Sequence, residues 1–524
     1  MTILTERGLD VAAPARSGLL WGGSLVVALF AFILGTLDAE AIYTGGDAVR
    51  KWLMAQLVIE GDASGVPFDH HTMRWAINGP AIGVIALFGA SAFTYLVAVS
   101  AVFAGVVALV WSLSMRLAGP LAAAMAVFLV FVDPLMLNTS AQLQPTIFGL
   151  TGLLIAVAAL WSWQREEADI WLVVTALALF FAYGAKITNL FFFPGPLLLL
   201  MVMGKWRAIA IIGAIFIALF AVETVAIRAL SGGELALGRI EGLTSGRHVD
   251  LMSTHEELVT FTWGDLFLRW WPMYIREVPM KSVIFAFFIV AALHPFLRRR
   301  VFTNETNLFR ADVLVAMGVS FAFFTTFFII SIDPLLLGQD LRVRYLYVLQ
   351  PFAALMVTAY IAALLTRLRF LERWPVALGS AAVLVASLGL VGWKFVRAEV
   401  ERDGVDGIYA VWQANGYFEE MRTHLERGCT IYVNNERAAT TLLMFAFPPA
   451  TITPNDALYF FRPDGSPVAG TDATVSLELV PAEALELDHW RRSRQPLYRL
   501  SLSGGETQCE DTLYVGDTDV RVML

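Results

Sequence analysis

The chain has 524 residues, of which 57% are hydrophobic and only 16% carry a charge, and its formal net charge is −8. A soluble globular chain has about a quarter of its residues charged. This composition, together with repeated apolar runs of roughly 20 residues, predicts a polytopic α-helical membrane protein. Positive charge is confined to short loops and forms no basic face, which excludes a nucleic-acid-binding protein.

The first apolar run covers residues 18–37 and follows Arg7 and Arg16. It ends near Ala39-Glu40-Ala41, which is similar to a signal-peptidase site. The apolar core of a cleavable signal peptide is usually only about 7–15 residues long, so we predict an uncleaved membrane anchor. The basic residues before it predict a cytoplasmic N-terminus.

The polar segment 38–78 is then expected outside the membrane, and the apolar stretch 79–89 is too short to span it. The other expected spans are 92–115, 119–136, a segment ending at Trp163, 170–185, 187–203, 208–230, 282–297, 311–331, 344–366 and 375–395. Every inner loop of this arrangement carries Lys or Arg, most clearly at Arg298-Arg299-Arg300. The positive-inside rule therefore supports about eleven transmembrane helices in residues 1–395, with outer loops at 38–91 and 231–281.

The second outer loop contains four aromatic residues of the kind that favours the headgroup layer: Trp263, Trp270, Trp271 and Tyr274. Part of this loop is expected to form an amphipathic helix at the membrane surface.

The composition changes again at about residue 396. Residues 429–433 and 512–515 have the β-branched and aromatic pattern of strands, and residues 411–426 have a helical pattern. We expect residues 396–524 to form a small α/β domain on the outer, periplasmic or extracytoplasmic, side of the cytoplasmic (inner) membrane.

The two cysteines of the chain, Cys429 and Cys509, both lie in this C-terminal segment. In an exported domain they are able to form a disulfide. Closing a loop of about 80 residues would stabilise the domain by roughly 4 kcal/mol in the chain-entropy model. Two buried free thiols are the alternative.

Three outer elements hold most of the unusual polar side chains. They are the first outer loop with Asp47, Arg50, Asp62, Asp69, His70, His71 and Arg74, the turn at Lys186, and the late loop with Asp333, Asp340, Arg342, Arg344 and Tyr345. Carboxylates suited to base catalysis and cations suited to a phosphate group would thus meet at a boundary between water and lipid.

Each of these residues also has a purely structural interpretation. Asp47 is well placed to cap a helix over residues 48–59, and Lys186 to extend its amine toward the headgroups. Arg342 and Arg344 would be ordinary juxtamembrane charges, although the outer side is the wrong one under the positive-inside rule. Adjacent histidines point apart on a helix or strand, so His70 and His71 are expected to contact substrate or pack rather than bind a metal.

Taken together, four stretches resemble the GT-C superfamily of membrane glycosyltransferases, in particular the branch of protein O-mannosyltransferases and lipid A aminoarabinose transferases. They are similar, in order, to the family's first outer loop, its proline-containing jaw, its G-x-x-x-K region and its RYLLP start of a late span. The residues concerned are Gly46-Asp47-Ala48 with Gly61-Asp62 and Val66-Pro67, then Met73-Arg74 through Gly79-Pro80 to Ser91, then Phe181 to Asn189, and Arg344 to Pro351.

The resemblance implies an inverting transferase that takes a sugar from a polyprenyl-phosphate donor, a membrane lipid, to a glycan, lipid or protein acceptor, with no further cofactor. It implies that Asp47 is the base that activates the acceptor. The donor phosphate would be held by Lys186, Arg344 and Arg342. Substrate contacts would come from His70, His71, Arg74, Tyr345 and Gln144.

One departure from the family pattern concerns the position before the fourth span, where many relatives place a second acid. This chain has Gln144-Pro145 there, and a neutral amide cannot act as a base. Two other classes therefore stay open. A transporter would carry charges near the membrane midplane, whereas Glu223 falls inside an expected span near its outer end. A non-catalytic GT-C-like protein that binds a polyprenyl lipid would explain Gln144.

Overall fold

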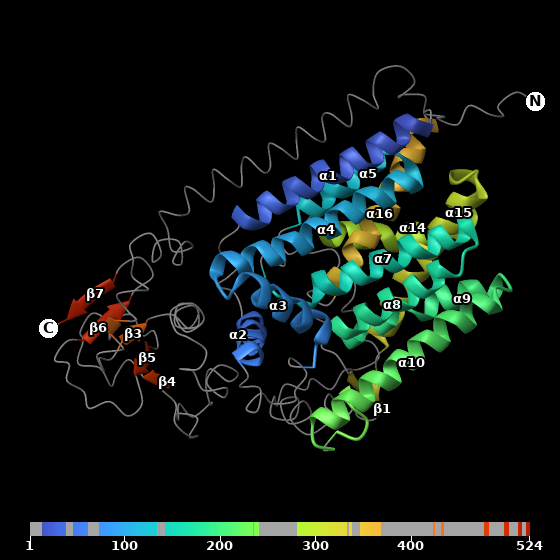
Figure 1. Cartoon of the computed structure of the whole chain (residues 1–524). Helices are drawn as coiled ribbons and strands as arrows, with labels where there is room; N and C mark the ends of the chain where they lie inside the picture. Colours follow the sequence, from blue (N-terminus) through green and yellow to red (C-terminus); the bar gives the residue numbers. More distant parts are fainter. Residues whose placement is uncertain are drawn as a thin grey trace, which may run out of the picture.

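The computed structural model describes residues 13–37, 46–60, 73–133, 136, 142–233, 235–239, 280–327, 329–332, 335–337, 346–367, 423–424, 431–433, 476–480, 497–501, 512–515 and 520–523. Its helices, labelled as in Figure 1, are α1 (Ala13–Leu37), α2 (Gly46–Glu60), α3 (Trp75–Phe88), α4 (Ala92–Ala118), α5 (Pro120–Phe131), α7 (Pro145–Glu166), α8 (Ile170–Ala185), η3 (Ile187–Phe192), α9 (Pro194–Val202), α10 (Trp206–Leu230), α14 (Met280–Val301), α15 (Glu305–Thr326), η5 (Tyr347–Leu349) and α16 (Gln350–Arg367).

Five helical segments among the described residues are long and apolar enough to cross a membrane: Phe93–Ala118, Pro145–Glu166, Trp206–Leu230, Glu305–Thr326 and Tyr347–Leu365. Further apolar helices are shorter, among them α5 and α8. The chain is therefore an α-helical membrane protein. The expected span 375–395 lies outside the described residues, so the total of eleven stays a prediction.

Local sequence signals explain where several helices begin and end. The Ser91 hydroxyl accepts a hydrogen bond from the Thr94 amide at the start of α4. Gly119, with φ of 88°, separates α4 from α5 and adopts a left-handed conformation that a side chain would disfavour. The expected span 187–203 is present as a short apolar helical segment, Ile187–Val202. It divides into η3 and α9 because Pro194, which has no amide proton, begins a new helix at its first position.

A correction concerns the predicted span 311–331. The helix α15 ends at Thr326, and a short antiparallel hairpin of β1 (Ile329–Ile332) and β2 (Leu335–Leu337) follows it. These residues are isoleucines and leucines, and the β-branched isoleucines favour a strand as readily as a helix. The apolar run alone did not distinguish the two conformations.

The helices form one bundle in which α7 packs between α4 and α8, α1 lies along α4, and α14, α15 and α16 pack on one another (Figure 1). Small residues allow the closest approaches. A Cβ added at Gly152 of α7 would lie 2.6 Å from the Ala178 carbonyl oxygen of α8. Such contacts are typical of membrane helices, which associate through tight packing rather than through the hydrophobic effect.

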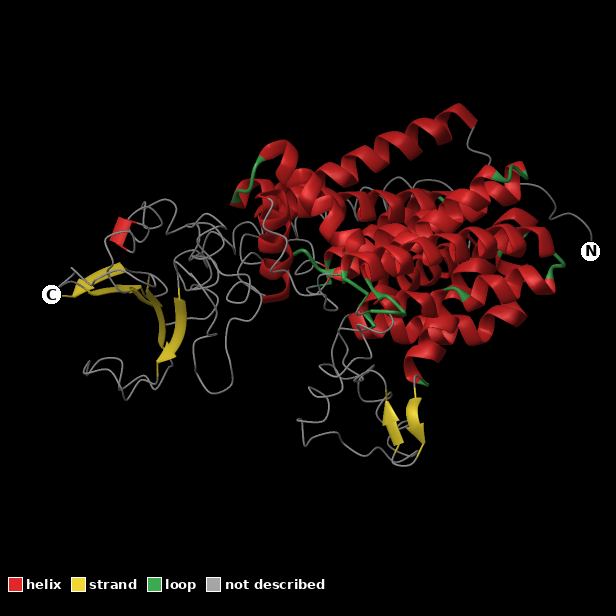
Figure 2. Cartoon of the chain, turned by 60° about the horizontal axis from the view of Figure 1, so that its bottom comes forward, coloured by secondary structure: helices red, strands yellow, loops and turns green. Residues whose placement is uncertain are grey.

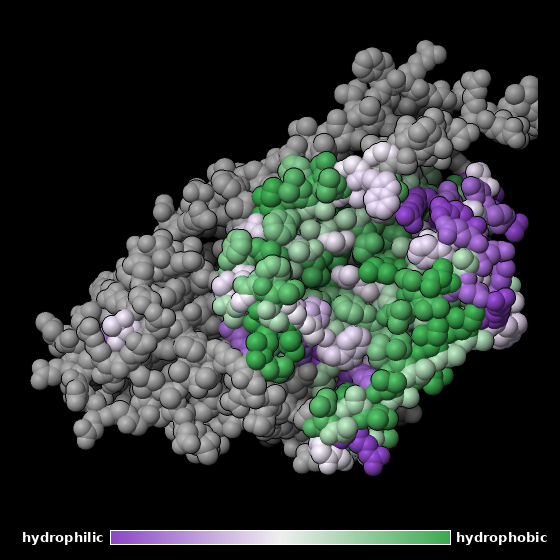
Figure 3. Space-filling view, viewed as in Figure 1, coloured by the Kyte–Doolittle hydropathy of each residue, from purple (hydrophilic) through white to green (hydrophobic). Residues whose placement is uncertain are grey.

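One end of the bundle collects basic residues, and we call it the cationic end: Arg116, Arg165, Lys205, Arg207, Arg298, Arg299, Arg300 and Arg310. Contacts join the helix ends and loops that carry several of them. Arg310 donates to the Arg116 carbonyl, Arg207 pairs with Asp169, and Lys205 lies over the Trp163 ring. Figure 3 shows hydrophilic residues gathered at one edge of the bundle and a broad hydrophobic face beside them.

The helices α7, α8 and α10 run from the cationic end to the opposite end of the bundle. Each helix has one terminus at the cationic end, so the far termini, at Gln144, Lys186 and Leu230, lie at the other end, which we call the α2 end. A helix of the length of α7 spans about 33 Å. The loops expected on the inner side of the membrane therefore lie at one end of the bundle, and those expected on the outer side, as far as the structure describes them, lie at the other.

The C-terminal strands form a five-stranded sheet in the order β4-β5-β3-β6-β7, apart from the helical bundle (Figure 2). The strands are β3 (Ile431–Val433), β4 (Ser476–Val480), β5 (Leu497–Ser501), β6 (Thr512–Val515) and β7 (Val520–Met523). The strands expected at 429–433 and 512–515 are thus present as β3 and β6, which pair in parallel. Cys429 and Cys509 precede these two neighbouring strands and lie outside the described residues, as does most of the expected helix 411–426.

Candidate functional site

At the α2 end, helix α2 contacts the loop that leads into α7. Lys51 is buried in α2, with 1% of its surface exposed, and its Nζ donates a hydrogen bond to the Leu143 carbonyl oxygen at 3.1 Å. A buried ammonium group is unfavourable unless acceptors meet it, so this contact holds the helix against the loop. Asp47 lies one helical turn before Lys51, as the second residue of α2 rather than as a residue before the helix.

The same loop is fixed from its other side by α4. The Leu143 amide donates to the Tyr95 hydroxyl at 3.1 Å, and the Tyr95 ring meets the ring of Trp52 edge-on at 5.1 Å. The side-chain amide of Gln144 donates to the Gln142 oxygen at 2.6 Å. Two positions selected from the sequence, Asp47 and Gln144, thus lie on elements that contact each other directly.

A second pair of elements meets at the start of α3 and the end of α8. Trp75 packs so closely on Gly184 that an added Cβ at Gly184 would lie 2.4 Å from the Trp75 ring. Arg74 precedes Trp75 as the residue before α3, and Lys186 follows α8 as its C-terminal cap in an extended conformation. Arg74 and Lys186, both selected from the sequence, therefore also lie on contacting elements, and α3 in turn packs against α2.

Trp75 also contacts a buried ion pair between Glu223 of α10 and Arg239, which lies in the segment after α10. The Trp75 Nε1 donates to Glu223 Oε1 at 2.7 Å, and Arg239 Nη1 lies 3.6 Å from the same oxygen. The Arg239 guanidinium also covers the Tyr183 ring at 4.7 Å. The side chains of Arg239 and Glu223 are only 3% and 7% exposed. Burial lowers the pKa of Arg239, and the nearby Tyr183 and Glu223 oppose that effect.

The remaining site residues expected from the sequence are His70, His71, Arg342, Arg344 and Tyr345, and all five lie outside the described residues. Within the described part of the chain, no three His, Cys, Asp or Glu side chains come together as metal ligands would. The structure thus brings together the elements of Asp47, Arg74, Gln144 and Lys186.

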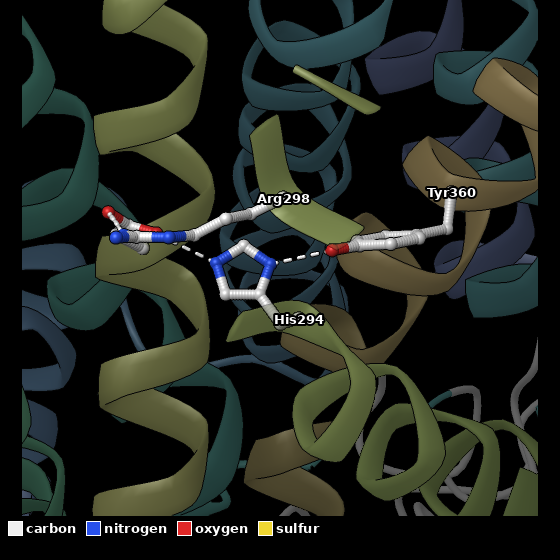
Figure 4. Close-up of polar contacts among 4 residues, drawn as sticks. His294, Arg298 and Tyr360 are labelled. Atoms are coloured by element: carbon white, nitrogen blue, oxygen red, sulfur yellow. Dashed lines mark hydrogen bonds and ion pairs between the residues drawn. The ribbon is translucent and has the colours of Figure 1, made fainter. Parts of the chain in front are cut away.

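A different polar network occupies the cationic end. His294 of α14 contacts the Asp312 carboxylate of α15 through Nε2 at 2.7 Å and the Tyr360 hydroxyl of α16 through Nδ1 at 2.7 Å. Arg298 donates to the other Asp312 oxygen at 2.6 Å. Figure 4 shows the His294 ring between Arg298 and Tyr360. A neutral imidazole satisfies both bonds, donating to the carboxylate and accepting from the hydroxyl.

Sequence reasoning missed several of these residues. Lys51 had one available signal, because it follows Asp47 by four residues and so lies on the same side of a helix as that acid. Glu223 was noted as an acid inside a span, but its partners Trp75 and Arg239 have no local signal. No protein-family model matches the chain, and no curated protein sequence matches it.

Proposed function

We propose that the protein is a glycosyltransferase that moves a sugar from a polyprenyl-phosphate donor to an acceptor, with inversion, on the outer side of the cytoplasmic membrane. In this proposal about eleven helices span the membrane, the N-terminus is cytoplasmic and residues 396–524 lie outside. The resemblance to the GT-C superfamily supports it. The single structural observation in its favour is the contact between α2, which carries Asp47, and the loop that ends at Gln144, made through Lys51 and Leu143.

The chemistry needs a base and a cationic clamp. An acceptor hydroxyl loses its proton to the Asp47 carboxylate while its oxygen attacks the anomeric carbon of the donor. The bond from that carbon to the phosphate oxygen breaks, and the polyprenyl phosphate leaves with the bonding electron pair. Lys186 and Arg344, with Arg342, would stabilise the charge that develops on the phosphate.

The position of the site suits a lipid-linked donor. A polyprenyl tail requires lipid, and a sugar phosphate requires polar partners. The α2 end combines polar elements with the termini of membrane-spanning helices. The neutral amide at Gln144 leaves Asp47 as the base of this proposal and gives Gln144 a role in contacting substrate.

Transfer of radiolabelled sugar from polyprenyl-phosphate donors by the purified full-length protein tests the proposal. Asp47→Asn should lower the turnover number by about 10²–10⁴, the range expected for loss of a general base. Glu60→Gln, at the other end of α2, removes an acid from the same helix and should leave transfer unchanged. Lys186→Gln should mainly raise the KM for the donor.

The alternatives have distinct signatures in the same experiment. Undiminished transfer by Asp47→Asn would overturn the assignment of the base. Retention of donor lipid without transfer by the unmodified protein would identify a lipid-binding protein. Uptake of a solute into proteoliposomes, with no transfer, would identify a transporter.

A further inference from the structure

The cations of the cationic end differ in how their charge is balanced. Arg298 pairs with Asp312, Arg207 with Asp169, and Arg165 with Glu166. Arg310, in the second turn of α15, forms no ion pair with any carboxylate in the part of the chain that the structure describes. It is nonetheless partly buried between helices, where an unbalanced charge is unfavourable.

The surroundings of Arg310 explain part of its placement. Its Nη1 donates to the Arg116 carbonyl at the end of α4, at 2.5 Å, and to Asn307 Oδ1 at 3.0 Å. Its guanidinium lies 5.5 Å from the ring centroid of the buried Trp161. The first contact satisfies a terminal helix carbonyl, and the aromatic contact is favourable for a cation. The Arg310 Nε is buried and has no hydrogen-bond partner among the described residues.

These contacts bring two more arginines close to Arg310. Arg116, in the last turn of α4, is the residue whose carbonyl Arg310 binds. Arg165, in the last turn of α7, lies one helical turn after Trp161, whose ring faces the Arg310 guanidinium. The charges of both arginines oppose that of Arg310. Among the described residues, the carboxylate of Glu166 lies beside Arg116 and Arg165. It is already engaged by Arg165 and by the Trp171 indole, which donates to it at 2.7 Å.

Three cations from three helices therefore meet here, and in the described part of the chain the ion pair among them is that of Arg165 with Glu166. An anion at this point would offset their repulsion and give the unpartnered Arg310 nitrogen an acceptor. Guanidinium groups bind phosphate oxygens through paired, charge-assisted hydrogen bonds. The cluster lies where α4 and α7 end, and both helices are long and apolar enough to cross a membrane, so we expect their ends at the level of the lipid headgroups. Basic sites between helices at that level bind anionic lipids.

We propose that Arg116, Arg165 and Arg310 form a binding site for the phosphate group of an anionic membrane lipid. Bound there, the lipid holds the ends of α4 and α7 against the start of α15. The site is at the opposite end of the bundle from Asp47, and it does not depend on the glycosyltransferase proposal.

Binding of dioleoylphosphatidylglycerol to the full-length protein in detergent, followed by native mass spectrometry, tests this site. Arg116→Gln is the decisive variant, because it removes a cation and leaves in place the carbonyl that Arg310 binds. It should weaken lipid binding about fivefold, the effect of one basic residue near an anionic lipid. Arg310→Gln should weaken it at least as much.

Arg300→Gln is the matched control, since it removes an exposed charge from the same end outside the cluster. It should leave the affinity unchanged, and dioleoylphosphatidylcholine should bind no more tightly to the unmodified protein than to Arg116→Gln. Equal weakening by Arg300→Gln would overturn the proposal in favour of a diffuse surface charge. Competition by millimolar inorganic phosphate at constant ionic strength would overturn the lipid as the source of the phosphate group.

Discussion

Asp312 is the residue on which the network at the cationic end depends. Its two oxygens bind His294 and Arg298 separately, and only 14% of its side chain is exposed. Asp169 makes a single ion pair with Arg207, and both of those side chains are well exposed, at 43% and 81%. The same residue type thus has a strong structural role in one place and a weak one in another, because burial decides how much an ionic contact contributes.

Asp312→Asn should lower the free energy of unfolding by roughly 2 kcal/mol, since it leaves Arg298 without an anion and disturbs the His294 contact in a largely buried place. Asp169→Asn should change it by less than about 0.5 kcal/mol, because exposed ion pairs contribute little. Thermal unfolding of both purified variants in the same detergent measures the difference. Equal effects of the two substitutions would contradict the structural role of Asp312.

At this scale the sequence predicted some site positions but not their partners. The helix carrying Asp47 and the helix ends next to Gln144 and Lys186 follow from local patterns of acids, prolines and apolar runs. The start of α3 after Arg74 does not, since the polar segment was expected to continue to residue 78. The Trp75–Glu223 bond joins residues 148 positions apart, and no local pattern encodes such a contact. Lys51 shows the same difficulty, because its acceptor is a backbone carbonyl, which every residue possesses.

At the scale of elements, α7 and α8 show how small residues set helix contacts. An added Cβ at Gly152 of α7 would lie 2.6 Å from the Ala178 carbonyl oxygen and 2.8 Å from the Ala182 amide nitrogen, both backbone atoms of α8. Backbone atoms cannot move aside as the end of a flexible side chain can. By contrast, a Cβ added at Gly213 of α10 would meet nothing within 4 Å.

Gly152→Ala should therefore destabilise the protein by about 1–3 kcal/mol, the range for overpacking a tight contact. Gly213→Ala should be neutral or stabilise it by up to about 1 kcal/mol, because alanine is the better helix former. Size-exclusion profiles after heating a detergent extract provide the measurement for both variants. If Gly152→Ala survived heating as well as Gly213→Ala, the close packing of α7 on α8 would be wrong.

Apolar runs in the sequence predict some of these elements better than others. Apolar runs located α4, α7 and α10 to within a few residues, because each run is bounded by charged or turn-forming residues. They did not reveal the division of residues 187–202 into η3 and α9, nor the hairpin after Thr326. Both occur within continuous apolar sequence, where hydrophobicity by itself does not specify backbone conformation.

At the scale of the whole molecule, the two ends of the bundle have different chemistry. The cationic end gathers basic residues from α4, α7, α14 and α15, whereas the α2 end brings together the elements that carry Asp47, Arg74, Gln144 and Lys186. Short loops rich in Lys and Arg stay in the cytoplasm in most membrane proteins. The separation of the two groups therefore predicts which end faces which compartment.

Alkaline phosphatase, which is active only after export, reports that orientation when it is fused at the two ends of the bundle in a bacterial host. A fusion after Gly232, beyond the end of α10, should be active. A fusion after Asn304, which follows Arg298, Arg299 and Arg300, should be inactive, and fluorescent protein fused at the same place should fluoresce. The reverse pattern would put Asp47 in the cytoplasm, where a polyprenyl-linked donor on the outer leaflet could not reach it. Activity at both positions would instead mean that α14 does not cross the membrane between them.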